Sequence, residues 1–312
     1  MVDTEVSVPG AHSPRVVARL DKPRRQNLAG WLFVGPVILG VLAFQIVPVI
    51  ASLGVSMTNW TGLNDPDFLG LSNFVALFTT DTRFYATLTN TAIFTVAIVF
   101  LSIAIGLGLA VLCNQKIRGV GVFRTLYYSP AITNVVAIGL VWFWLYEPNN
   151  GLINSALRGI GISGPAWLSD PRTALIAVII VALWQGVGYP MVILLAGLQS
   201  IDRSLLEAAT VDGASNWRRF WSITFPLLTP SIFFLTIMQF ISSFQVFGII
   251  YVMTSGGPNN ATSVLIFEIY QVAFAQGRLG YAAAMGWVLF LIVGLVTAFQ
   301  WKMEKRWVHY DS

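Results

Sequence analysis

The chain has 312 residues, of which 56% are hydrophobic and only 10% are charged, and its formal net charge is +4. A soluble domain normally carries about 25% charged residues, so this composition excludes an ordinary soluble globular domain. The basic residues are dispersed and flank long apolar stretches, which argues against a nucleic-acid-binding surface and favours contact with anionic lipid.

The two ends of the chain are polar. The first 26 residues contain three prolines and few large apolar side chains, and we expect residues 1–27 to form a disordered cytoplasmic tail. The apolar stretch that follows is too long, and begins too late, for a cleaved signal peptide. Residues 304–312 are expected to form a second, shorter cytoplasmic tail.

Six apolar runs lie between these tails. Each is long enough to cross a bilayer, because about 20 apolar residues span roughly 30 Å of hydrocarbon as a helix. The runs lack the alternation of barrel strands, and a helix satisfies its own backbone hydrogen bonds in lipid. We therefore predict an all-α membrane protein with six transmembrane helices, at residues 31–57, 88–113, 126–146, 174–200, 230–253 and 281–300.

The basic residues predict the orientation of these spans. With the N-terminus inside, 14 of the 18 Lys and Arg residues fall on the cytoplasmic side, and only Arg83, Arg158, Arg172 and Arg278 fall outside. Membrane proteins carry such an excess of Lys and Arg in their cytoplasmic loops. Both termini are therefore predicted to be cytoplasmic.

Several kinds of chemistry lack their residues in this sequence. No lysine follows a glycine, so the phosphate-binding signature G-x-x-x-x-G-K-[ST] is missing and the chain alone is predicted not to bind ATP. The two histidines, His12 and His309, lie in opposite tails, and Cys113 is the single cysteine, so neither a metal site nor a catalytic residue is predicted. The spans also lack ionisable residues at their centres, which argues against a proton- or sodium-coupled carrier.

The polar segment 201–229 separates the fourth and fifth spans on the predicted cytoplasmic side. Ser204 and Glu207 have the spacing of a capping box, so a short helix is predicted to begin at Ser204 and to end near Asp212. Gly213 permits the left-handed backbone that ends such a helix.

The same segment then predicts a second helix, capped by either Ser215 or Asn216. Pro226 and Pro230 mark the entry to the fifth span. We therefore expect segment 201–229 to fold as a helix–turn–helix at the membrane surface. Such an element can dock as a rigid unit into a groove on a soluble partner.

Segment 201–229 resembles the cytoplasmic coupling loop of ABC-importer permeases, in which E-A-A precedes a glycine and an apolar-Thr-apolar-Pro ending. Segment 244–258 is similar to the F-x-x-F-D-x-I-Y-x-x-T-x-G-G-P stretch of carbohydrate-importer permeases of the maltose and glycerol-3-phosphate type. The resemblance extends over about residues 28–301. One position departs from it: Gly248 stands where the family often has Asp, so a hydrogen-bonding carboxylate is missing there.

The resemblance implies a type I ABC importer permease core at residues 28–303, multi-pass in a bacterial or archaeal cell membrane. It further implies a second permease subunit, two ATPase subunits that bind ATP and Mg, and an external binding protein that delivers a carbohydrate. This chain itself is then expected to hold no cofactor and to perform no covalent chemistry. The residues implied to couple to the ATPase are Glu207, Ala208, Ala209, Asp212, Gly213, Arg218 and Pro226.

Uncharged polar and aromatic side chains in the fourth and fifth spans are candidates for the substrate path. Sugars offer hydroxyl groups to hydrogen-bond and apolar C–H faces to stack on rings. The alternative for each polar side chain is a hydrogen bond between helices, which membrane proteins commonly make. The candidates are Trp184, Gln185, Gly188, Tyr189, Gln239, Ser242, Ser243, Phe244, Gln245, Phe247 and Gly248.

The predicted function is therefore transport of a carbohydrate or related polyol compound by an ATP-driven importer. Two other functions stay open at this point. A stand-alone secondary carrier or channel explains six spans but leaves segment 201–229 without a role. A membrane-embedded enzyme requires a nucleophile, a metal site or a carboxylate set, and the sequence shows none of these.

Overall fold

The computed structural model describes residues 24–63, 65–115 and 118–307, and the predicted tails lie mostly outside these ranges. Within them the secondary structure is helical apart from one antiparallel bridge between Thr58 and Phe68. The chain divides into two compact units after Ala51. The first unit contains α1 (Arg24–Val41), η1 (Leu42–Ile46) and the beginning of α2 (Val47–Ser56), so helical structure begins four residues before the expected boundary at residue 28.

Three described helical stretches are long and apolar enough to cross a membrane without a break: Gly30–Ser56, Thr82–Cys113 and Leu279–Glu304. Three further stretches pass the same test only as pairs of helices joined at a bend, with angles of 99°, 44° and 61°. Up to six spans result if each bent pair is one span, and the six predicted runs then each have a counterpart. The bent pairs nevertheless differ from the straight helices that the sequence predicts.

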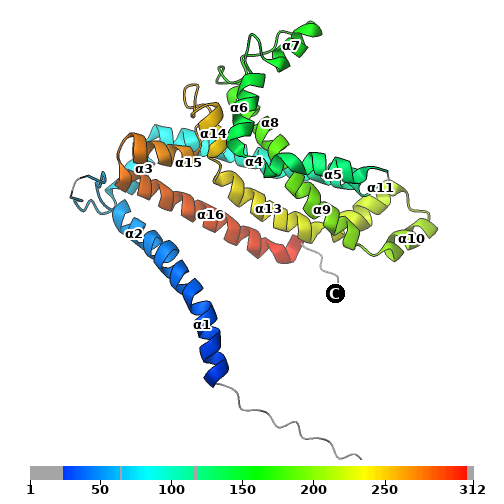
Figure 1. Ribbon diagram of the computed structural model, residues 1–312, viewed down its shortest axis with the longest axis horizontal. Coiled ribbons are helices and arrows are strands. Elements are labelled where there is room, and N and C mark those ends of the chain that lie inside the picture. The colour runs from blue at the N-terminus through cyan, green and yellow to red at the C-terminus, as the bar shows by residue number, and fades with distance from the viewer. Residues whose placement is uncertain (1–23, 64, 116–117, 308–312) are drawn as a thin grey trace, which may run out of the picture. The chain divides into compact units, whose positions relative to one another are not determined.

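The second unit is built around the long helix α4 (Thr82–Cys113), drawn in cyan in Figure 1. Its two ends and its middle contribute to three separate apolar clusters. Phe84 packs with α3 (Ser72–Thr79) and α16 (Leu279–Trp307). Phe94 packs with α6 (Val135–Leu145), α8 (Ala174–Gly186) and α14 (Gly248–Met253). Ala110 packs with α9 (Gly188–Ser200) and α13 (Thr229–Phe244). Helix α4 therefore forms the common support for the elements that carry the candidate site.

The third predicted span is broken. Helix α5 (Val120–Tyr128) continues through the short turn η2 (Ser129–Ile132), and the chain then bends by 99° into α6 (Val135–Leu145). Pro130 lies in η2 and removes a backbone N–H, and the side chain of Asn134 accepts a hydrogen bond from the N–H of Val136, which starts a new helix. The continuous helix predicted over residues 126–146 is wrong for this reason.

The fourth predicted span bends by 44° between α8 (Ala174–Gly186) and α9 (Gly188–Ser200). Pro190 lies in the first turn of α9, where it has no N–H to donate to the carbonyl of Gly186. A proline inside a helical run is a common cause of such a bend. Helix α7 (Leu152–Gly159) lies in the excursion between α6 and α8 (Figure 1).

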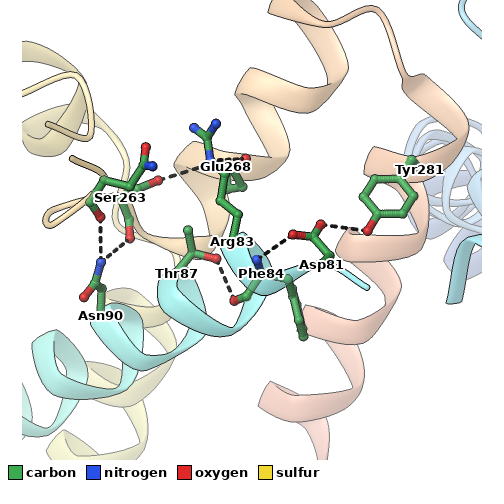
Figure 2. Close-up of polar contacts among 9 residues, drawn as sticks. Asp81, Arg83, Phe84, Thr87, Asn90, Ser263, Glu268 and Tyr281 are labelled. Atoms are coloured by element: carbon green, nitrogen blue, oxygen red, sulfur yellow. Dashed lines mark hydrogen bonds and ion pairs between the residues drawn. The ribbon is translucent and has the colours of Figure 1, made fainter. Parts of the chain in front are cut away.

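The fifth predicted span is also broken: α13 (Thr229–Phe244) ends before Gln245, and the chain continues as α14 (Gly248–Met253), so the continuous helix predicted over residues 230–253 is wrong. Between α14 and α16 the chain forms α15 (Leu265–Tyr270) and η4 (Gln271–Ala275). Figure 2 shows how this segment is tied to α4: Arg83 Nε lies 2.9 Å from the buried carboxylate of Glu268. In addition, the Thr91 hydroxyl accepts a hydrogen bond from the N–H of Leu265 at 2.8 Å.

Candidate functional site

A cavity of about 570 Å³ lies where η2, α8, α9, α13 and α14 meet, and we call it the Gln185–Gln239 cavity. None of its lining residues carries a charge. Its polar side chains are Tyr128, Gln185, Tyr189, Gln239 and Ser242, and its remaining lining residues are Ala131, Val135, Ala182, Gly186, Met238, Val246, Gly248 and Ile249. The cavity therefore combines aromatic rings, neutral hydrogen-bonding groups and apolar surface.

Gln185 and Tyr189 enter the cavity from the two sides of the α8–α9 bend. They are four residues apart, so a helical path brings them onto neighbouring positions of one face. The amide nitrogen of Gln185 donates to the carbonyl of Thr133, in the break between η2 and α6, at 3.4 Å. The bend between η2 and α6 thus supplies a hydrogen-bond acceptor for a side chain of α8.

Gln239 and Ser242 enter the cavity from α13 and are separated by one helical turn. The amide nitrogen of Gln239 donates to the hydroxyl of Ser102 on α4 at 2.7 Å. Ser102 is buried, so this bond joins two helices. An amide also has an acceptor oxygen and a second N–H, so Gln239 can bond Ser102 and a ligand at the same time.

The structure does not bring all the predicted substrate-path residues into this cavity. Gly188 packs against α5, where an added Cβ would collide with the carbonyl oxygen of Tyr127. The Ser243 hydroxyl donates to the Gln239 carbonyl of its own helix at 2.6 Å. Both positions therefore serve close packing in this structure.

Three predicted aromatic residues lie against other rings outside the cavity lining. The Trp184 ring centroid is 5.5 Å from that of Trp142, and Phe244 lies 4.7 Å from Phe240. Phe247 contacts a cluster of rings on α14 and α15.

Gln245 follows the end of α13 with an exposed side chain, and it also lies outside the lining. Contact of these four residues, Trp184, Phe244, Gln245 and Phe247, with a substrate stays a prediction.

Gly248, the position that departs from the family pattern, begins α14 and lines the cavity. An added Cβ there would lie 2.9 Å from Cγ1 of Val135. An aspartate at this position therefore requires Val135 to move, so glycine at 248 and valine at 135 fit one another.

Sequence reasoning missed Tyr128, Ala131 and Val135, because they line the cavity only through the 99° bend between η2 and α6. The sequence signals for that bend are Pro130, which ends one helix, and Asn134, which caps the next.

Segment 201–229 folds as α10 (Arg203–Val211), α11 (Asn216–Arg219), η3 (Phe220–Thr224) and α12 (Phe225–Leu227). The helix–turn–helix is confirmed, but the predicted cap of the first helix is wrong. Asp202 is the cap, and its carboxylate accepts a hydrogen bond from the Ser204 N–H at 2.9 Å. That bond lowers the pKa of Asp202. An anion at a helix N-terminus is also favoured by the helix dipole, which explains why Asp202 replaces Ser204 as the cap.

The turn between α10 and α11 has the left-handed backbone at Gly213 that the sequence predicts. Gly213 has a φ of +74°, in the left-handed region that favours glycine. Ser215, one of the two predicted caps, begins α11 and accepts a hydrogen bond from the Arg218 N–H at 3.3 Å.

Helix α10 has an exposed and a half-buried face. Glu207, Ala208 and Val211 are exposed, Val211 by 88%, whereas Leu206 and Ala209 are half-buried. The acidic residue of the E-A-A motif is therefore presented to solvent. Of the other residues implied to couple, Asp212, Gly213 and Arg218 are also exposed, while Pro226 is half-buried in α12.

Comparison with protein families gives one decisive match. Residues 102–309 match the family described as binding-protein-dependent transport system inner membrane component. The chain belongs to this family. The resemblance to ABC-importer permeases is thereby confirmed, and the chain is a transport permease rather than an enzyme.

Relatives and solved structures extend the match along the permease. This chain is 40% identical to the probable ABC transporter permease protein YesP of Bacillus subtilis, over 93% of its own length and 94% of that protein. It is 37% identical to the multiple sugar-binding transport system permease protein MsmF of Streptococcus mutans, over 89% and 95%. A chain of a bacterial alginate ABC transporter, solved with an alginate pentasaccharide-bound periplasmic protein, aligns with a TM-score of 0.81 at 22% identity, over 90% and 95%. The permease thus has the type I ABC importer fold and is a multi-pass membrane protein.

Proposed function

We propose that this permease translocates a carbohydrate or related polyol compound as the membrane subunit of an ATP-driven importer. Its partners in this proposal are a second permease subunit, two ATPase subunits that bind ATP and Mg, and an external binding protein. Six spans, both termini in the cytoplasm, and a place in the bacterial or archaeal cell membrane belong to the same proposal. The names of sugar-transport relatives such as MsmF support it.

The Gln185–Gln239 cavity carries the proposal. A sugar presents several hydroxyl groups and apolar C–H faces, and the cavity offers neutral donors and acceptors next to the rings of Tyr128 and Tyr189. Because no Lys or Arg lines the cavity, it lacks the donors that normally hold a phosphate group. This half of the path therefore favours an uncharged sugar over a sugar phosphate or a glycerol phosphate.

Segment 201–229 supplies the link to the ATPase in this proposal. The exposed face of α10, with Glu207 and Ala208, docks on the ATPase, and closure of the two ATPases moves the loop. Because α12 runs directly into α13, the movement reaches the helix that carries Gln239 and Ser242. The core then alternates between inward- and outward-facing states, as a rigid-body transition.

A labelling experiment tests the cavity. Cys113 is the only cysteine and is buried, so a Cys113→Ser background allows single cysteines to be placed at will. In the assembled transporter, Ser242→Cys is expected to react with a small maleimide and to be protected by the transported sugar. Ser243→Cys is the matched control, because its side chain is buried against its own helix and is expected to react slowly with or without sugar.

Failure of every neutral mono-, di- or oligosaccharide to protect Ser242→Cys, in a transporter that still hydrolyses ATP, refutes the assignment of this cavity to a sugar.

A further inference from the structure

Arg219 is the last residue of α11, and its guanidinium group bridges the two helices of segment 201–229. One terminal nitrogen, Nη1, donates to the hydroxyl of Thr210 on α10 and lies 3.5 Å from the carbonyl oxygen of Leu206. The other, Nη2, donates to the side-chain oxygen of Asn216 on α11. Arg219 thus holds both helices at once.

The group on α10 that receives this contact is itself fixed. The Thr210 hydroxyl donates its own proton to the Leu206 carbonyl at 2.7 Å, which leaves its lone pairs free to accept from Arg219. Leu206 and Thr210 are one turn apart, and Glu207 begins the exposed face beside them. The contact therefore sets the rotation of α10, and with it the direction in which Glu207 faces.

The surroundings of Arg219 make it the main polar connection between the helices. Helix α10 has nine residues, and α11 begins the continuous helical stretch Asn216–Leu227; isolated helices shorter than about 12–15 residues are only marginally stable in water. Behind them lies a cavity of about 270 Å³, lined partly by Leu206, Asn216 and Arg219, so apolar packing does not fill this space. In the described part of the chain no carboxylate pairs with Arg219; its partners are neutral oxygens.

We propose that Arg219 is a positioning residue, which clips α10 to α11 so that the ATPase-docking face moves as one body with the helix that follows. The planar guanidinium suits this task, because its two terminal nitrogens reach different acceptors, whereas a lysine carries a single nitrogen. This inference rests on the proposed docking role of α10, and it adds a residue that does not itself need to touch the ATPase.

The clip is tested first in the full-length chain in lipid nanodiscs, with Cys113→Ser and nitroxide labels at Val211→Cys and Arg218→Cys. Both label sites are exposed. Arg219→Met is expected to at least double the width of the measured distance distribution, and Arg219→Lys is expected to broaden it as well. Thr210→Val approaches the clip from the other helix and is expected to broaden the distribution, whereas Thr210→Ser keeps the hydroxyl and restores the parent width.

Arg203→Met is the matched control, because Arg203 is also an arginine in this loop and its side chain is exposed at the start of α10. It is expected to leave the distribution unchanged. A distribution as narrow as the parent in both Arg219→Met and Thr210→Val overturns the clip.

The second readout is ATP hydrolysis by the assembled transporter in proteoliposomes. Arg219→Met is expected to lower the stimulation by substrate-loaded binding protein by about fivefold or more, a typical size for energetic coupling between sites. Thr210→Ser is expected to retain it. Unchanged stimulation with a broadened distribution refutes the proposed role in coupling.

Glu207→Lys, measured in parallel, separates the two proposals. Normal uptake by Glu207→Lys defeats the docking role of α10, while the distance measurement still decides whether Arg219 holds the loop together.

Discussion

Gln239 lies at the point where helix packing and substrate binding have to be separated. Its amide bonds Ser102 on α4 at 2.7 Å, and the same side chain lines the Gln185–Gln239 cavity. We predict that Gln239→Leu weakens uptake of the transported sugar, because leucine keeps the bulk but neither donates nor accepts hydrogen bonds. The substitution removes the hydrogen bond to Ser102 and the predicted hydrogen bond to the sugar.

The magnitude follows from the bonds that are removed. A hydrogen bond contributes about 0.5–1.5 kcal/mol net, and about 1.4 kcal/mol is a factor of ten, so loss of one bond to the sugar weakens transport by about two- to twelvefold. The bond to Ser102 belongs to the protein, and interhelical hydrogen bonds in membranes average about 0.6 kcal/mol. Its loss is therefore expected to lower the stability of the permease slightly.

A double-mutant cycle assigns the effect. Initial uptake rates in proteoliposomes are compared for the parent, Ser102→Ala, Gln239→Leu and the double variant, at matched amounts of inserted protein. Ser102→Ala alone is expected to change uptake by less than about twofold, and Gln239→Leu is expected to lower it by the same factor in either background. If Ser102→Ala reproduces the whole defect and the double variant is no worse, Gln239 acts through α4, and its contact with the sugar is refuted.

Three further predictions concern segment 201–229. Glu207→Lys is expected to insert normally but to lose ATPase association, because it reverses the charge on the exposed face of α10; co-purification of the ATPase measures this, and normal recovery contradicts it. Gly213→Val is expected to destabilise the turn by about 1–2 kcal/mol, since a β-branched side chain is strained at a φ of +74°, whereas Gly213→Asn is tolerated better. Protease resistance of segment 201–229 compares the two variants, and equal resistance contradicts the predicted strain. The hydrogen bond from the Ser204 N–H lowers the pKa of Asp202. The charged Asp202 cap therefore stabilises α10 fully above the ordinary aspartate pKa of about 4, and this stabilisation is lost as the pH falls through the lowered pKa. Hydrogen exchange of the α10 amides measures the stabilisation, and Asp202→Asn is expected to remove its pH dependence.

The continuous spans were predictable because their apolar runs are uninterrupted. Helices α4 and α16 contain no proline, and a long apolar helix is the simplest way to satisfy the backbone in lipid. The bends in the other spans were harder to predict from the sequence. Pro130 and Pro190 are visible in the sequence, but whether a proline breaks a span or merely kinks it depends on the groups that take up the freed carbonyls. The 99° bend after η2 is therefore a property of the packed structure.

The candidate site shows the same division. Gln185, Tyr189, Gln239 and Ser242 were identified because polar residues in apolar spans are conspicuous. The sequence alone does not show which of Ser242 and Ser243 faces the cavity. The two side chains differ in direction by about 100° around α13, so Ser242 lines the cavity and Ser243 faces the packed interior. In the loop, the Asp202 cap and the Arg219 clip depend on which of several nearby polar groups reaches the backbone or the other helix.

In the proposed function this permease imports a sugar with energy from ATP. The most direct test of this function is uptake of labelled carbohydrates into proteoliposomes that contain the permease, its partner permease, the ATPase and the binding protein. We predict accumulation of at least one neutral carbohydrate that requires both ATP and the binding protein, and that Glu207→Lys abolishes. Sugar accumulation that proceeds without ATP, driven by an ion gradient, contradicts the account.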